Sequence, residues 1–244
     1  MLIERLREVG STSDYLRAEM PDAPHGTVVS AHTQTAGRGQ RGNSWEAEPG
    51  MNLTFSILLR PSGIEAREQY SLSEAVATAI ASTLRKLLPE PQPLTIKWPN
   101  DIYYADSKLA GILIENSLSG SSISKAIAGI GININQSLFN SDAPNPISLR
   151  QITGRSYDTD QLLEEIAGAV IAAVDTLPAE AAQIHERYLS MLWRRQGFHP
   201  YKEPDGERFV ASIASIAPTG HLTLRRPDGS EKTYAFKEVI ALIE

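Results

Sequence analysis

The chain has 244 residues, 41% of them hydrophobic and 21% charged, which suits one large domain or a large domain with a small appendage. It contains no cysteine, which excludes disulfides, a cysteine nucleophile and thiolate-bound zinc. The net charge of −6 disfavours binding to a nucleic acid backbone, because that affinity comes largely from Lys and Arg neutralising phosphates.

The apolar segments are short. The run that starts at Ala169 is far below the roughly 20 residues of a membrane span, and the charged N-terminal residues contain no secretory signal. We therefore expect a cytoplasmic protein with no membrane segment. Only ten residues precede the first motif, too few for a helix-turn-helix module, so we expect no nucleic acid partner.

Strands and helices follow one another irregularly up to Trp193. Small hydroxyl residues at Ser11, Thr12 and Ser13 precede a short amphipathic run and predict a helix N-cap. Apolar periodicity predicts the remaining elements. The expected strands cover 27–33, 52–60, 94–98, 102–104, 108–118 and 123–133, and the expected helices cover 66–88, 158–177 and 178–192.

The pattern changes after Trp193, where short strands with glycine turns follow over residues 207–242. The segment 196–206 holds two Gly and two Pro and predicts a boundary between domains of residues 1–195 and 196–244. Strands without a regular βαβ repeat predict an α+β fold with a mixed or antiparallel sheet, joined to a small β-barrel-like module.

The segment Gly37-Arg38-Gly39-Gln40-Arg41-Gly42 matches the glycine pattern of dinucleotide-binding loops. That interpretation fails on context, because this loop leads through Trp45 to a strand and not to a helix N-terminus. Glycines let a ligand approach the backbone closely, and Arg38 and Arg41 can bind phosphate or carboxylate oxygens. The alternative is a tight hairpin with solvated arginines.

Two further polar motifs stand at strand ends. Asn100 and Asp101 follow a Lys-Trp-Pro run, where they either face a cleft or cap a turn, and Asp101 is a candidate Mg²⁺ ligand. Lys108 opens an apolar strand that contains Gly111. It either places a cation at a reacting carboxylate or phosphate, or remains solvated.

The predicted strand 123–133 contains alternating glycines at positions 129 and 131 and ends at Asn133. Such glycines predict either a ligand or backbone lying against the strand, or dense sheet packing. Trp45 is either a core anchor or a stacking platform for a base. The five histidines are scattered, and no Gly-x-Ser-x-Gly motif is present, so zinc-enzyme and hydrolase readings have no support.

Taken together and in this order, these segments resemble biotin protein ligases. The match covers about residues 8–135 and rests on Ser11-Thr12-Ser13, Gln34 to Gly42 with Trp45, Lys97 to Asp101, Lys108 to Leu113, and Gly129 to Asn133. The resemblance implies a catalytic domain of the kind shared with class II aminoacyl-tRNA synthetases and a small SH3-like C-terminal barrel.

Members of this family join biotin to ATP as biotinyl-5′-adenylate, with Mg²⁺, and pass the biotinyl group to a lysine of a biotin carboxyl carrier protein domain. The resemblance implies catalytic roles for Arg38, Lys108 and Asp101, with Asp101 also as the metal ligand. The implied biotin contacts are Ser11, Thr12, Ser13, Gln34, Gly37, Arg38, Gly39, Gln40, Lys108 and Gly111. The implied ATP contacts are Arg38, Arg41, Trp45, Asn100, Lys108 and Asn133.

Two positions depart from the family pattern. Ser13 stands where members commonly have Asn, which bears on its role as a ligand contact. Gln40 stands where many have another Arg, and because a cation is lost there, we expect weaker retention of the adenylate. With no room for a DNA-binding module, we expect a monofunctional ligase, as a monomer or a homodimer. The alternatives are a lipoate–protein ligase and a non-catalytic module that sequesters biotin.

Overall fold

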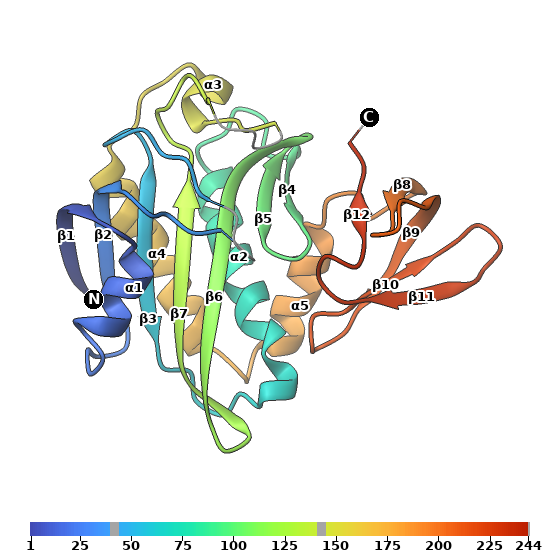
Figure 1. Cartoon of the computed structure of the whole chain (residues 1–244), viewed down its shortest axis with the longest axis horizontal. Helices are drawn as coiled ribbons and strands as arrows, with labels where there is room; N and C mark the ends of the chain where they lie inside the picture. Colours follow the sequence, from blue (N-terminus) through green and yellow to red (C-terminus); the bar gives the residue numbers. More distant parts are fainter. Residues whose placement is uncertain (40–43, 141–144, 244) are drawn as a thin grey trace.

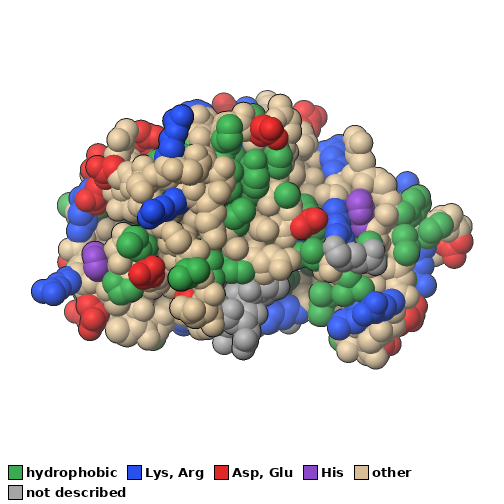
Figure 2. All heavy atoms as spheres, turned by 90° about the horizontal axis from the view of Figure 1, so that it is seen from above, with side chains coloured by type: hydrophobic (Ala, Val, Ile, Leu, Met, Phe, Trp, Pro, Cys, Tyr) green, Lys and Arg blue, Asp and Glu red, His purple; other side chains and the backbone are tan. Residues whose placement is uncertain are grey.

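The computed structural model describes residues 1–39, 44–140 and 145–243, which form two β-sheets with helices packed on the larger one (Figure 1). The predicted loop residues Gln40, Arg41 and Gly42 lie outside the described residues. Seen from above, the smaller sheet projects from one end of the larger part, and apolar side chains reach the surface of both (Figure 2).

A seven-stranded mixed sheet forms the larger part, in the order β1-β2-β3-β7-β6-β5-β4. β1 pairs with β2 in parallel, and the other neighbours pair antiparallel. The predicted α+β fold with a mixed sheet is therefore confirmed, although β1 was not predicted. The strands are Leu2–Val9, Thr27–Gln34, Leu53–Leu59, Leu94–Lys97, Asp101–Tyr104, Ser107–Ser119 and Ser122–Ile132 for β1 to β7.

The helices cover both faces of this sheet. Val28 packs in the main core and Val29 in a second cluster with Leu16 of α1, because successive side chains of a strand point to opposite faces. Helices α2, α4 and α5 lie behind the sheet in Figure 1, and α1 lies in front. The helices are Thr12–Ala18, Tyr70–Arg85, Leu149–Thr153, Thr159–Asp175 and Ala181–Ser190 for α1 to α5.

Two predicted helices begin later than expected. The predicted helix 66–88 is divided into a 3₁₀ turn at Ala66–Glu68 and α2, which starts at Tyr70. The helix expected from Pro178 starts at Ala181, and the short helix α3 was not predicted. None of the helices in the described part of the chain is long and apolar enough to cross a membrane.

The C-terminal strands form a five-stranded antiparallel sheet, in the order β11-β10-β9-β8-β12. The predicted turns at 218–220 and 227–229 are present, and Gly220 and Gly229 take the positive φ that such turns require. β8 lies inside the segment 196–206, so the domain boundary stays a prediction. The strands are His199–Lys202, Arg208–Ile216, Leu222–Arg225, Glu231–Tyr234 and Ile240–Ala241 for β8 to β12.

Candidate active site

A cavity of about 900 Å³ lies between the large sheet and the C-terminal sheet. Strands β6 and β7 form one side of it, and apolar side chains of the C-terminal strands and turns, among them Tyr201, Phe236 and Ile240, form another. Most of the predicted site residues that the structure describes line this cavity, and Gly37 does not. Those that line it are Ser11, Thr12, Ser13, Gln34, Arg38, Gly39, Trp45, Asn100, Asp101, Lys108, Gly111 and Asn133.

One end of the cavity is a chain of hydroxyl groups. Thr12 donates from its backbone N and from Oγ1 to Oε1 of Gln34, at 2.8 and 3.1 Å. Ser56 Oγ lies 2.7 Å from Thr12 Oγ1 and 2.8 Å from Ser13 Oγ. Because a hydroxyl donates only one proton, the direction is Ser13 to Ser56 to Thr12 to Gln34. Ser11 caps α1 by accepting from the backbone of Asp14.

Ser56 is the member of this hydroxyl chain that sequence reasoning missed. It is fully buried within a continuous apolar strand, so no local pattern distinguished it. It stands opposite Gly129 in the β3–β7 register, and a Cβ on Gly129 would lie 2.8 Å from Ser13 Oγ. The glycine therefore lets the start of α1 approach the sheet, which confirms that another segment lies against this strand.

Trp45 covers strands β6 and β7 where two glycines face each other. Gly111 and Gly131 are paired across β6 and β7, and a Cβ on Gly131 would enter the indole ring. Trp45 is only partly buried, yet its Nε1 is shielded from solvent and has no hydrogen-bond partner among the described residues. The backbone N of Trp45 donates to Gly37 O at 3.0 Å. Gly37 therefore fixes the backbone of Trp45, although it does not itself line the cavity.

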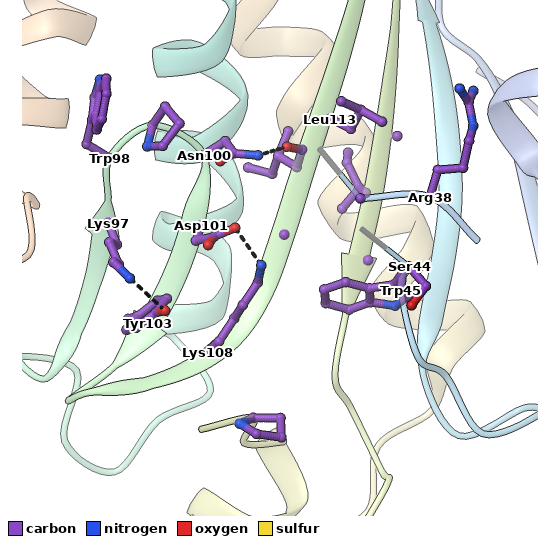
Figure 3. A pocket seen from close by; sticks show the side chains of 18 of the residues that line it. Arg38, Ser44, Trp45, Lys97, Trp98, Asn100, Asp101, Tyr103, Lys108 and Leu113 are labelled. Carbon is purple, nitrogen blue, oxygen red and sulfur yellow. Dashed lines mark hydrogen bonds and ion pairs between the residues drawn. The ribbon is translucent and has the colours of Figure 1, made fainter. Parts of the chain in front are cut away.

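The other end of the cavity carries the charged groups (Figure 3). Lys108 Nζ lies 2.8 Å from Asp101 Oδ1 and 5.7 Å from the centre of the Trp45 ring. The side chains of Lys108 and Asp101 are 27% and 22% exposed, so solvent and a ligand can both reach them. The side-chain amide of Asn100 donates to Ile112 O, and the backbone oxygen of Asn100 accepts from Ile112 N. These two bonds attach the loop before Asp101 to β6.

A second lysine stands beside this pair. Lys97 Nζ donates to Tyr103 Oη at 3.0 Å and lies 5.3 Å from the centre of the Trp193 ring. Burial lowers the pKa of Lys97 and raises the pKa of Tyr103. The sequence placed Lys97 in a motif without a role, and the structure adds it to the cavity.

Arg38 does not join Lys108 and Asp101, although we predicted that the three act together. Its Nη2 lies 2.7 Å from Asp14 Oδ1 and 3.3 Å from Glu115 Oε2, and Arg17 contacts the same two carboxylates. Figure 3 shows the Arg38 side chain directed away from Lys108 and Asp101.

Asn133 and Asp101, the predicted metal ligand, both line the cavity. Asn133 is buried and donates to the backbone oxygens of Lys108 and Ile147, at 3.4 and 3.1 Å, so its amide holds the start of β6. Within the described ranges, no group of three or more His, Cys, Asp or Glu side chains could hold a metal ion, so Asp101 belongs to no such cluster.

Comparison with known proteins shows which family the chain belongs to. Residues 6–133 match the model of the biotin/lipoate A/B protein ligase family. The chain belongs to that family. The bifunctional ligase/repressor BirA of Escherichia coli is 30% identical over 236 residues, which cover 95% of this chain and 71% of that protein.

Two further members of the family extend the comparison. The biotin–[acetyl-CoA-carboxylase] ligase of Paracoccus denitrificans is 35% identical over 145 residues, which cover 58% of this chain and 60% of that protein. The biotin protein ligase of Aquifex aeolicus, in complex with biotin and ATP, has the same fold, with a TM-score of 0.81. That match covers 99% of each chain at 24% identity. The predicted resemblance and fold class are confirmed.

Proposed function

We propose that the chain is a biotin protein ligase that forms biotinyl-5′-adenylate from biotin and ATP and then transfers the biotinyl group to a carrier lysine. The observation that carries this proposal is the placing of the hydroxyl chain and the Lys108–Asp101 pair in one cavity. Gly129 lies against the hydroxyl chain, and Gly131 is paired with Gly111, which lies beside Lys108. The two glycines of β7 are two residues and therefore about 7 Å apart along the strand.

The hydroxyl chain favours biotin over lipoate. The fused ring of biotin carries a ureido group with two N–H donors and one carbonyl oxygen, which suit Ser13 Oγ and the Gln34 amide. The dithiolane ring of lipoate offers no such groups, so it would leave these buried polar atoms unpaired. A site built for hydrogen bonding rejects an analogue that lacks those bonds.

The charged end suits adenylate formation. An oxygen of the biotin carboxylate attacks the α-phosphorus of ATP, the bond to the β-phosphate oxygen breaks, and pyrophosphate leaves. Two anions must meet in this step, and Lys108 offsets their repulsion. Asp101 orients Lys108 through their 2.8 Å contact. Trp45 lines the cavity beside Lys108 and presents its ring to the nucleotide.

Mg²⁺ fits this arrangement as an ion carried by ATP. It prefers oxygen ligands and commonly binds one carboxylate together with substrate phosphates, and Asp101 supplies that carboxylate. To contact the acid or the phosphate, the Arg38 side chain would turn from Asp14 and Glu115 toward the ligand.

In the transfer step, the amine of the carrier lysine attacks the acyl carbon, AMP leaves, and an amide bond forms. The amine loses a proton, for which Asp101 is the acceptor inside the cavity. The name of the Paracoccus relative supports the carrier domain of a biotin-dependent carboxylase as the partner.

The test is pyrophosphate release from ATP and Mg²⁺, with biotin or lipoate supplied separately and a biotin carrier domain added afterwards. We expect biotin-dependent release, followed by a biotinyl mass increase on one carrier lysine. Release that depends on lipoate instead would replace biotin as the substrate. Biotin binding without release would leave a sequestering protein and remove the roles given to Lys108 and Asp101.

A further inference from the structure

Two buried tyrosines lie behind the loop that carries Asp101. Tyr70, at the start of α2, donates from Oη to Pro99 O at 2.9 Å. Its Oη also lies 2.7 Å from Oη of Tyr188 in α5, and the two rings meet edge to face at 5.9 Å. Tyr188 is completely buried and Tyr70 is 7% exposed, so solvent does not replace these bonds.

The direction of these hydrogen bonds follows from the number of protons. Burial raises the pKa of both tyrosines, so both hydroxyls stay protonated. Tyr70 gives its single proton to Pro99 O, so Tyr188 must donate to Tyr70. Removing the Tyr188 hydroxyl therefore leaves the bond from Tyr70 to Pro99 in place, whereas removing the Tyr70 hydroxyl leaves Pro99 O without that donor.

The loop from Trp98 to Asp101 is held by three separate parts of the molecule. Trp98 Nε1 donates to Gly220 O in the β9–β10 turn at 2.9 Å. Asn100 exchanges hydrogen bonds with Ile112 of β6. Tyr70 supplies the third attachment, through Pro99.

Tyr70 also contacts the C-terminal sheet directly. Its backbone N donates to Pro218 O at 3.2 Å, and a Cβ on Gly220 would lie 2.7 Å from the Tyr70 ring. One side chain therefore touches both the loop that carries Asp101 and the turn that brings the smaller sheet to the cavity.

We propose that Tyr70 is a positioning residue, which holds Asp101 and the β9–β10 turn in the arrangement needed for adenylate formation. The proposal rests on the proposed function. Tyr70 acts through Pro99 and not on the substrate, since it does not line the cavity. Its effect should appear at the charged end. The hydroxyl chain of Ser13 and Ser56 is built on α1 and β3, whereas the side-chain hydrogen bonds of Tyr70 go to Pro99 and Tyr188.

The matched variants are Tyr70→Phe and Tyr188→Phe, each of which removes one buried hydroxyl. We expect both to lower the melting temperature. Only Tyr70→Phe should lower kcat for biotin-dependent pyrophosphate release, by about 10-fold to 100-fold, because small displacements at a reacting centre are costly. Biotin Kd should stay within about twofold in both variants, and kcat of Tyr188→Phe should stay within about threefold, since its loop contact remains.

Hydrogen exchange of the peptide covering residues 97–103 gives a second measurement that needs no activity. It should be faster in Tyr70→Phe than in Tyr188→Phe. Equal exchange in the two variants, or equal losses of kcat, would overturn the positioning role. If the natural chain shows no biotin-dependent release, the proposed function fails instead, and the exchange comparison still decides what Tyr70 holds.

Discussion

The two ends of the cavity are built differently. At one end, Thr12, Ser13 and Ser56 are short, buried and already hydrogen-bonded to one another. At the other end, Lys108 and Asp101 are longer, partly exposed and paired with each other. Short side chains lose little conformational entropy when a ligand binds, so the first end is ready for its ligand. The charged end must exchange its internal partners for the phosphates.

Replacing Lys108 by alanine, at the charged end of the cavity, should have the largest effect on activity. It removes the cation beside the reacting anions, so we expect kcat for pyrophosphate release to fall by about 10²-fold to 10³-fold. The melting temperature should change little, because the ion pair with Asp101 is partly solvated. Lys86→Ala, at an exposed position, is the control. A loss smaller than about fivefold would contradict the role of Lys108.

Two glycines on β7 allow the ends to be disturbed one at a time. Gly131→Ala places a methyl group in the Trp45 ring, and Gly129→Ala places one 2.8 Å from Ser13 Oγ. We expect Gly131→Ala to weaken ATP binding about tenfold, or about 1.4 kcal/mol, and Gly129→Ala to weaken biotin binding by a similar factor. Titration calorimetry with biotin and with a non-hydrolysable ATP analogue measures both.

Each glycine variant serves as the control for the other, because the substitution and the strand are the same. If both variants weakened both ligands equally, the ends would not be independent, and the cavity would have to be treated as one site.

The smallest effect concerns a pair away from both ends. Glu74 in α2 is 4% exposed and lies 2.8 Å from Nδ1 of His185. Burial raises the pKa of Glu74, so the folded chain binds this proton more tightly than the unfolded chain. The resulting stability is present below the ordinary pKa of about 4.3 and is lost as the pH rises through the raised pKa.

Glu74→Gln removes this titration. From about pH 4 to about pH 7, its melting temperature should therefore rise relative to that of the natural chain, with activity nearly unchanged. Thermal unfolding at several pH values checks this, with Glu186→Gln at an exposed neighbouring position as the control. A difference independent of pH would show that the raised pKa of Glu74 has no effect on stability.

The elements that were predicted correctly have strong local patterns. The apolar runs of β3, β6 and β7 and the glycine turns of the smaller sheet are visible in short windows of sequence. The edge strand β1 was missed because charged residues interrupt its apolar positions, and none of its residues is fully buried. The short helix α3 had a usable signal, since Ser148 and Gln151 form a capping box.

The sequence predicted the site residues that belong to a short motif. It did not predict those whose roles depend on contacts between distant segments. Lys108, Asp101 and Ser13 belong to recognisable runs. Ser56 is hidden in an apolar strand, and the partner of Tyr70 is 118 residues away. Arg38 pairs with Asp14 of α1 and Glu115 of β6, which lie 24 and 77 residues away in the sequence. The glycine motif around Arg38 contains no sign of these two partners.

The smaller sheet has a consequence for the time at which activity can arise during synthesis. β12, at Ile240–Ala241, lines the cavity and pairs with β8, while Ser11 lies at the opposite end of the chain. Contacts between such distant residues form late, because closing a long loop costs entropy before any contact repays it. A ribosome must therefore pass Ala241 before the cavity is complete, and we expect a nascent chain to form no reactive acyl-adenylate before then.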